Sequence, residues 1–114
     1  MEAFKHDDIR IRLNGFEDDP DFAIYIKGLV DQIHFEEAPS DSTTMASFTK
    51  YEQLVTGAIQ ISSIQGVFSA KARGVDGRQV VHQVFREIRH QLNRWKRRRW
   101  RKEHTDKSEF YPAP

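Results

Sequence analysis

Cysteine is absent from this chain of 114 residues, and so is any long run of apolar residues. Without cysteine the chain has no disulfide, no thiolate ligand for zinc and no thiol nucleophile. No stretch is apolar enough for a transmembrane helix, and the first residues lack the apolar segment of a signal peptide. We therefore expect a soluble, cytoplasmic protein that does not associate with membranes.

Acidic residues are scarce in the second half of the chain. Residues 61–114 carry thirteen lysines and arginines against five acids, a balance of +8. Residues 1–60 carry five against twelve, a balance of −7, so the net charge of +1 conceals a division of the molecule into two poles. The basic pole of such a protein attracts a polyanion, and the acidic pole is turned away from it.

Catalytic and metal-binding patterns are missing as well. Aspartates cluster near the start of the chain, at Asp7, Asp8, Asp18, Asp19 and Asp21. Helix caps and solvated loops use acids in this way. His82 and His90 lie eight residues apart, among cations that would repel a metal ion. Gly74 and Gly77 fit a turn and a helix start rather than a phosphate-binding loop. We therefore expect no enzymatic activity, no cofactor, no metal and no small-molecule substrate.

The first third of the chain predicts a strand and a helix. Residues 9–16, IRIRLNGF, alternate apolar and polar side chains, which is typical of a half-buried strand. Residues 17–33 predict a helix that Asp18 or Asp19 caps and that has Pro20 in its first turn. Its apolar stripe consists of Phe22, Ile26, Leu29 and Ile33.

The middle of the chain predicts three strands. Residues 36–44 form a loop by composition, and residues 45–63 and 66–73 are rich in β-branched and aromatic residues. We place the break within 45–63 at residues 51–53, and Gly66 with Gln65 at the turn before the last strand.

The clearest element is a helix predicted over residues 75–100, with Asp76 as its N-cap. Its apolar stripe consists of Val80, Val84, Ile88, Leu92 and Trp95, with Val81 and Phe85 beside it. This stripe ends at Trp95, so we expect the last turns to project beyond the core.

The expected elements follow one another in the order β-α-β-β-β-α. We predict a single α+β domain over residues 1–103, with a four-stranded sheet and two helices packed on one face. Residues 104–114 are polar and end in prolines, so we expect a disordered tail. The sequence shows neither a repeat nor a second domain, and we expect the free protein to be a monomer.

The predicted last helix presents a basic face opposite its apolar stripe. At about 100° per residue, the outward positions are His82, Arg86, Arg89, Asn93 and Arg97. Glu87 is the only acid between residues 78 and 102, whereas solvated helices usually mix both signs of charge. Arginine outnumbers lysine, and its planar fork suits phosphates. A polyanion that neutralises these charges is favoured over a solvated face, and over a membrane surface, because the sheet requires the apolar stripe.

Two tryptophans lie near the end of this helix. Trp95 is in register with the apolar stripe, so we predict that it packs on the core. Trp100 is out of register. It is available to stack on a base, to pack against a loop or to contact a second copy of the chain.

Residues 69–98, SAKARGVDGRQVVHQVFREIRHQLNRWKRR, resemble the last strand and second helix of the ribosome hibernation-promoting factors, also called ribosome-associated translation inhibitors. In that family a strand leads into an acidic N-cap and a long helix that ends in lysines and arginines. The residues that match this pattern are Asp76, Val80, Val81, Ile88, Gln91, Leu92, Arg94 and Lys96. Together with the order of the elements, the resemblance covers residues 7–100.

The sequence also departs from that family's pattern. Glu87, His90 and Asn93 stand where a basic residue is common, and the first helix has only Lys27 and His34 as basic residues.

The resemblance implies binding to the small ribosomal subunit, in the channel where messenger and transfer RNA would lie, and inhibition of translation. Some members of the family also promote ribosome dimers. From the basic character of the last strand and helix we predict that the RNA-binding residues are Lys71, Arg73, Arg78, His82, Arg86, Arg89, His90, Arg94, Lys96, Arg97 and Arg98.

Two other functions fit the same sequence. The arrangement also resembles a double-stranded RNA-binding domain, which would read the shape of another RNA target. A protein-interaction domain whose basic helix docks an acidic partner is the alternative from a different class. Binding to purified small subunits, with duplex RNA and transfer RNA as competitors, distinguishes these functions.

Overall fold

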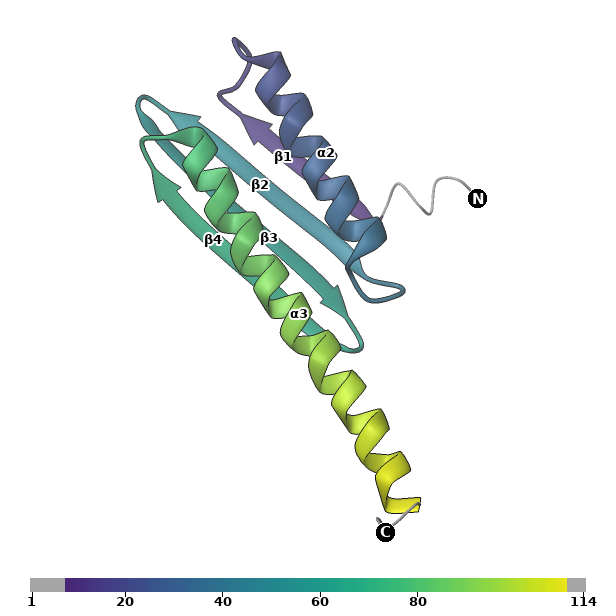
Figure 1. Cartoon of the computed structure of the whole chain (residues 1–114). Helices are drawn as coiled ribbons and strands as arrows, with labels where there is room; N and C mark the ends of the chain where they lie inside the picture. Colours follow the sequence, from purple (N-terminus) through teal and green to yellow (C-terminus); the bar gives the residue numbers. More distant parts are fainter. Residues whose placement is uncertain (1–7, 111–114) are drawn as a thin grey trace.

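A computed structural model describes the backbone of residues 8–110 and the side chains of residues 8–100. Its elements are β1 (Ile9–Asn14), α2 (Pro20–Glu36), β2 (Thr43–Tyr51), β3 (Leu54–Ser63), β4 (Gly66–Gly74) and α3 (Gly77–Phe110). The order β-α-β-β-β-α and the α+β class predicted from the sequence are confirmed (Figure 1).

The four strands form one mixed sheet in the order β1-β2-β3-β4. β1 pairs with β2 in parallel, and the two other pairs are antiparallel hairpins. A parallel pair needs a crossover, which α2 provides. Both helices therefore cover the same face, with α2 over β1 and β2 and α3 over β3 and β4, and the opposite face of the sheet stays uncovered (Figure 1).

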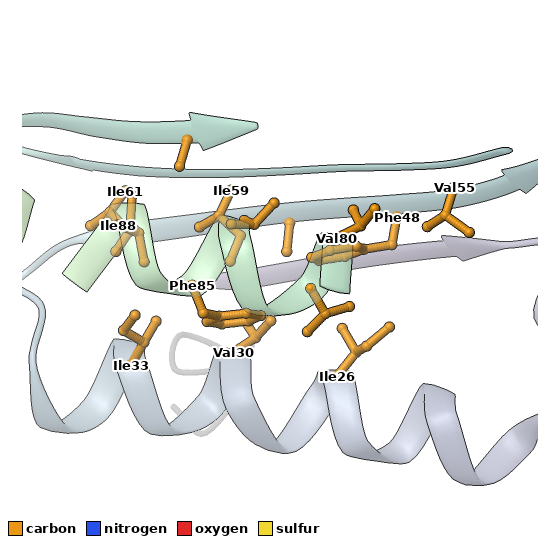
Figure 2. Packing of buried hydrophobic residues seen from close by; sticks show 14 of the residues in the cluster. Ile26, Val30, Ile33, Phe48, Val55, Ile59, Ile61, Val80, Phe85 and Ile88 are labelled. Carbon is orange, nitrogen blue, oxygen red and sulfur yellow. The ribbon is translucent and has the colours of Figure 1, made fainter. Parts of the chain in front are cut away.

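The core lies between the sheet and the two helices (Figure 2). Its fully buried side chains include Ile26, Val30, Ile33, Phe48, Ile59, Ile61, Val80, Val84, Phe85, Ile88 and Leu92. The stripe predicted for α3 is confirmed. In α2 the sequence pattern placed Leu29 in the stripe, but Leu29 is only half-buried and Val30 is fully buried. Because α2 contacts α3 as well as the sheet, its buried side is wider than the sequence stripe indicated.

Aspartates cap both helices. The Asp19 carboxylate accepts from the Phe22 backbone N–H at 3.3 Å, and Pro20 follows at the first position of α2. Asp76 Oδ1 accepts from the backbone N–H groups of Arg78 and Gln79, at 3.1 and 3.4 Å. Each cap satisfies N–H groups that have no partner within the helix, so both helices begin where the local sequence predicts.

Two-residue turns join the three antiparallel strands. The break expected at residues 51–53 is confirmed, since β2 ends at Tyr51 and β3 begins at Leu54. Glu52 occupies this turn with a φ of 58°, in the left-handed region. Gly66 opens β4 with a φ of 145°, a value that side chains rarely adopt. The loop expected at 36–44 is shorter in the structure, between Glu36 and Thr43.

Helix α3 is longer than the sequence pattern indicated. It runs for 34 residues, about 51 Å at 1.5 Å per residue. The nine residues of β4 span about 30 Å, so the helix overhangs the sheet (Figure 1). Residues 104–110, expected in the tail, continue α3, and no glycine or proline interrupts the chain before Pro112. Residues 111–114 lie outside the described residues.

Candidate nucleic-acid interface

The outward side of α3 carries most of the predicted RNA-binding residues. Those that are exposed are Arg78, His82, Arg86, His90, Arg94, Lys96, Arg97 and Arg98. The helical repeat places Arg86, His90 and Arg97 on the side away from the buried Ile88. The exposed side chains of His82, Arg86, His90, Arg94, Lys96, Arg97 and Arg98 form a basic strip along the helix. We call this strip the α3 basic face.

Arg89 is held by a partner within the chain. Its Nε donates to Glu37 Oε2 at 3.1 Å, and the two side chains are 34% and 21% exposed. Glu37 follows the end of α2, so the ion pair joins α2 to α3. The sequence pattern placed Arg89 among the outward cations, but its position beside Ile88 directs it toward α2 rather than directly outward.

Arg78 lies apart from the other cations of α3. Its guanidinium is 5.8 Å from the centre of the Phe22 ring and 6.0 Å from that of Tyr25. Both rings belong to the first turns of α2, at the end of the molecule where the aspartate-capped helices begin. Arg78 therefore links the two helix starts through cation–π contacts, about 28 Å along the helix from Arg97.

Lys71 and Arg73 lie on the opposite side of the sheet from α3. Side chains alternate along β4, with Phe68 and Ala70 buried toward the helices and Lys71 and Arg73 exposed on the uncovered face. The eleven residues predicted from the sequence therefore do not form one surface. Nine belong to α3 and two belong to the uncovered face of the sheet.

Glu87 is turned away from the α3 basic face. Its Oε2 accepts from Gln91 Nε2 at 3.0 Å. The same Gln91 amide donates to the Ser69 carbonyl at 2.7 Å and accepts from the Ser69 N–H at 3.0 Å. This arrangement covers part of the free edge of β4, which would otherwise be open to another strand. Glu87, the one acid between residues 78 and 102, thus orients Gln91 and does not neutralise the cations of the α3 basic face.

The overhanging part of α3 begins where Trp95 packs on the end of the core. The Trp95 and Phe68 rings meet edge to face, with centroids 6.0 Å apart and planes at 64°. The packing role predicted for Trp95 is confirmed. The Arg99 guanidinium lies over the Trp95 ring, 5.9 Å from its centre, and Trp100 is 59% exposed. Beyond Trp95 the side chains described are cationic, apart from Trp100 itself.

The acidic residues near the start of the chain are not gathered into a site. Asp19 caps α2, and Asp18 and Asp21 are exposed beside it. Asp7 lies outside the described residues. Among the side chains that the structure describes, no three histidines or acids lie close enough together to hold a metal ion. No helix in the described part of the chain is long and apolar enough to cross a membrane.

Several solved structures, including the following two, are similar to this chain. A ribosomal subunit interface protein from Coxiella burnetii matches with a TM-score of 0.59 at 14% identity, over 77% of this chain and 96% of that protein. The N-terminal domain of Protein Y from Thermus thermophilus matches with a TM-score of 0.48 at 14% identity, over 78% of this chain and 96% of that domain. The first likeness shows that the two proteins share a fold. No protein-family model and no curated protein matches the sequence.

Proposed function

We propose that this protein binds the small ribosomal subunit through the α3 basic face, in the channel for messenger and transfer RNA, and so inhibits translation. The observation that carries the proposal is the overhanging end of α3. Arg94, Lys96, Arg97 and Arg98 are exposed where this end begins, and residues 94–102 contain no acid. Clustered arginines destabilise a helix by mutual repulsion, and RNA phosphates remove that repulsion.

Two similarities support the ribosome as the partner. The protein shares its fold with a ribosomal subunit interface protein. Residues 69–98 also resemble the last strand and second helix of the ribosome hibernation-promoting factors. In this proposal the protein acts in the cytoplasm by occupying RNA rather than by catalysis, and it needs no cofactor.

Arg86 and Arg97 are the best-placed residues for phosphate contacts. Both are exposed on the outward side of α3, and they lie about 16 Å apart along the helix. Neither has the kind of ion pair that holds Arg89 to Glu37 within the described residues. Each phosphate contact releases condensed counterions and adds about 0.9 to the slope of log affinity against log salt.

Co-sedimentation with purified small subunits, measured over a range of salt, tests the proposal. The double variant Arg86→Gln/Arg97→Gln should bind more weakly, with a salt slope smaller by about two units. The matched control is Lys27→Gln/Lys50→Gln, which removes two exposed cations away from α3 and should bind like the wild type. If the α3 variant bound with unchanged affinity and slope, the basic face would be a solvated surface and the proposal would fail.

A second measurement separates the ribosome from other RNA targets. The wild-type protein should inhibit translation in a cell-free reaction, and the α3 variant should inhibit less. Duplex RNA and transfer RNA, added as competitors, should displace the protein from small subunits only in large excess. Displacement by an equal concentration of duplex RNA would instead indicate a general duplex-binding domain.

A further inference from the structure

The uncovered face of the sheet has a regular chemical pattern. Three rows of side chains run across its four strands, as the strand register shows. One row is Arg12, Ser47, Ala58 and Lys71. The neighbouring rows are Arg10, Met45, Gln60 and Ser69, and Asn14, Thr49, Thr56 and Arg73. Cations thus lie only on the two outer strands, and the centre is neutral.

The two cationic edges are separated by the width of the sheet. Strands lie about 4.8 Å apart, so β1 and β4 are about 14 Å apart. Between them lies a shallow hollow of about 740 Å³, lined by residues that include Arg10, Arg12, Met45, Ser47, Gln60 and Lys71. No residue of the four strands on this face is acidic. Glu87 reaches the rim of the hollow at the β4 edge, where it accepts from Gln91.

The chemistry of the centre identifies the kind of polyanion that fits. Aromatic side chains are absent from the lining of the hollow, so bases of a single strand have no ring on which to stack. An interface with a protein needs aliphatic or aromatic anchors at its centre. Of the apolar residues that line the hollow, Ile11, Ala46, Ile59 and Ala70 pack with the core on the other side of the sheet, and only Met45 and Ala58 belong to the rows of the uncovered face. Hydroxyl and amide groups lie beside these two residues on the central strands, at Ser47, Thr56 and Gln60.

We propose that the uncovered face of the sheet binds an RNA duplex across its minor groove. The minor groove of A-form RNA is wide and shallow and displays 2′-hydroxyl groups between two rows of phosphates. Arg10 and Arg12 contact one row of phosphates, and Lys71 and Arg73 contact the other. The hydroxyl and amide groups of the central strands bond to the 2′-hydroxyls. This surface is additional to the α3 basic face of the proposed function, and the protein is then held between two RNA elements.

The sequence-based prediction includes half of the residues proposed here. Lys71 and Arg73 are predicted to bind RNA from the basic character of the last strand and helix, but Arg10 and Arg12 are not. The signal was present in IRIRLN, because its alternation places the arginines on the face opposite the buried side chains. The parallel pairing of β1 with β2 then places them at the outer edge of the same face.

Binding of an RNA duplex of about 16 base pairs, measured by fluorescence anisotropy at several salt concentrations, tests this inference. All proteins carry Arg86→Gln/Arg97→Gln, so that binding through α3 is reduced and the result does not depend on the proposed function. Adding Arg12→Gln/Lys71→Gln should lower the salt slope by about two units. Between 50 and 200 mM salt, affinity should then fall about 12-fold less than it does without these changes. Adding Lys27→Gln/Lys50→Gln instead should leave the slope unchanged.

The contribution of the hydroxyl groups on the central strands is tested separately, again in proteins that carry Arg86→Gln/Arg97→Gln. Ser47→Ala/Thr56→Val keeps the charge and the strand but removes two hydroxyls, and it should reduce the preference for RNA over a DNA duplex of the same sequence by about fivefold. The four substituted positions, Arg12, Ser47, Thr56 and Lys71, are exposed, so the variants should fold like the wild type. Thermal melts followed by circular dichroism check this.

Three results would overturn the inference. They are an unchanged slope for Arg12→Gln/Lys71→Gln, equal affinity for DNA and RNA duplexes, and displacement of the duplex by polyglutamate of equal charge. The last would identify the face as a surface for acidic proteins. Loss of small-subunit binding in the α3 variant bears only on the proposed function, and duplex binding by the sheet is measured independently of it.

Discussion

Gly57 shows how a single residue determines the packing of this core. It lies opposite Phe48 in the β2–β3 pair, and a Cβ at this position would overlap the Phe48 ring. That ring is fully buried and stacks on Phe85 of α3, with the planes 6° from parallel. The absence of a side chain at Gly57 therefore allows the aromatic pair to join the sheet to the helix.

Gly57→Ala should lower the free energy of unfolding by about 1–3 kcal/mol, because the buried Phe48 ring has no space into which to move. Gly28→Ala is the matched control, since Gly28 is in a helix and nothing lies near its Cβ position. That change should stabilise the protein by about 0.5–1 kcal/mol. Urea denaturation measures both. Equal effects of the same sign would show that the Phe48 ring does not lie over Gly57.

The environment of His34 predicts that it contributes to a dependence of stability on pH. Its Nδ1 is hydrogen-bonded to the hydroxyl of the buried Thr44, at 2.7 Å. Burial lowers the pKa of His34, and the nearby carboxylates of Asp8 and Asp31 oppose that shift without cancelling it. The unfolded chain, in which the histidine pKa is 6.5, therefore binds a proton more readily than the folded protein.

The contribution of His34 to the free energy of unfolding should therefore be fully present above pH 6.5. It should be lost as the pH drops from 6.5 toward the lower pKa of folded His34. His34→Gln cannot take up a proton, so the difference in melting temperature between wild type and variant should shrink over this range. Thermal melts between pH 5 and 7.5 measure it. His82→Gln is the control, because His82 is exposed on α3. An identical pH profile for wild type and His34→Gln would contradict the account.

At the scale of elements, local sequence predicted where the helices and turns lie. Asp19 and Asp76 cap helices through contacts with the next few residues, and alternation in β1 identifies its buried side. Contacts between distant residues were not predictable. Arg89 pairs with Glu37, 52 positions away, and Gln91 bonds to Ser69, 22 positions away. Such partners depend on how the helices lie on the sheet, which a single sequence does not specify.

The end of α3 differs from prediction for a related reason. The polar composition and the prolines of residues 104–114 indicated that order would end near residue 103. The hydrogen bonds of a helix form within the helix and do not require a core, however, and α3 continues to Phe110. The binding residues were predicted from charge, and charge alone does not say on which face of the sheet a strand residue such as Lys71 lies.

Leu92 tests the packing of α3 on the sheet. Its side chain is fully buried near the last contact of the helix with the core. Leu92→Ala should cost about 2–5 kcal/mol, as expected for a buried leucine whose removal leaves a cavity. Asn93→Ala is the control, because the next residue is exposed and should change stability little. A loss below about 0.5 kcal/mol for Leu92→Ala in denaturant titration would show that this part of α3 does not pack.

Removing positive charge from the α3 basic face should weaken RNA binding but should not lower the stability of the fold. Arg86→Gln/Arg97→Gln removes two cations from a strip in which like charges are neighbours, so the melting temperature at low salt should stay level or rise. Arg89→Gln removes the ion pair with Glu37 and should lower it. Differential scanning calorimetry measures both variants. A lower melting temperature for the first variant would indicate that its arginines stabilise the fold.

At the scale of the whole molecule, charge is divided along the direction of α3. The starts of both helices and the turn between β2 and β3 lie at one end (Figure 1) and carry Glu17, Asp18, Asp19, Asp21, Glu52 and Asp76. The overhanging end of α3 lies at the other (Figure 1). A molecule with this dipole approaches a polyanion with α3 foremost, because the acidic end is repelled. The orientation of the bound protein is therefore part of the proposal.

The absence of cysteine allows that orientation to be measured directly, since one introduced cysteine carries a probe to a single position. The most direct test attaches an iron chelate at Asn93→Cys on α3, or at Gln53→Cys in the turn between β2 and β3, and maps cleavage of ribosomal RNA in purified small subunits by hydroxyl radicals. Both positions are exposed. We predict cleavage from Asn93→Cys in the RNA that lines the messenger and transfer RNA channel, and weak cleavage from Gln53→Cys. No cleavage from Asn93→Cys, or the same cleavage from both positions, would contradict binding through α3.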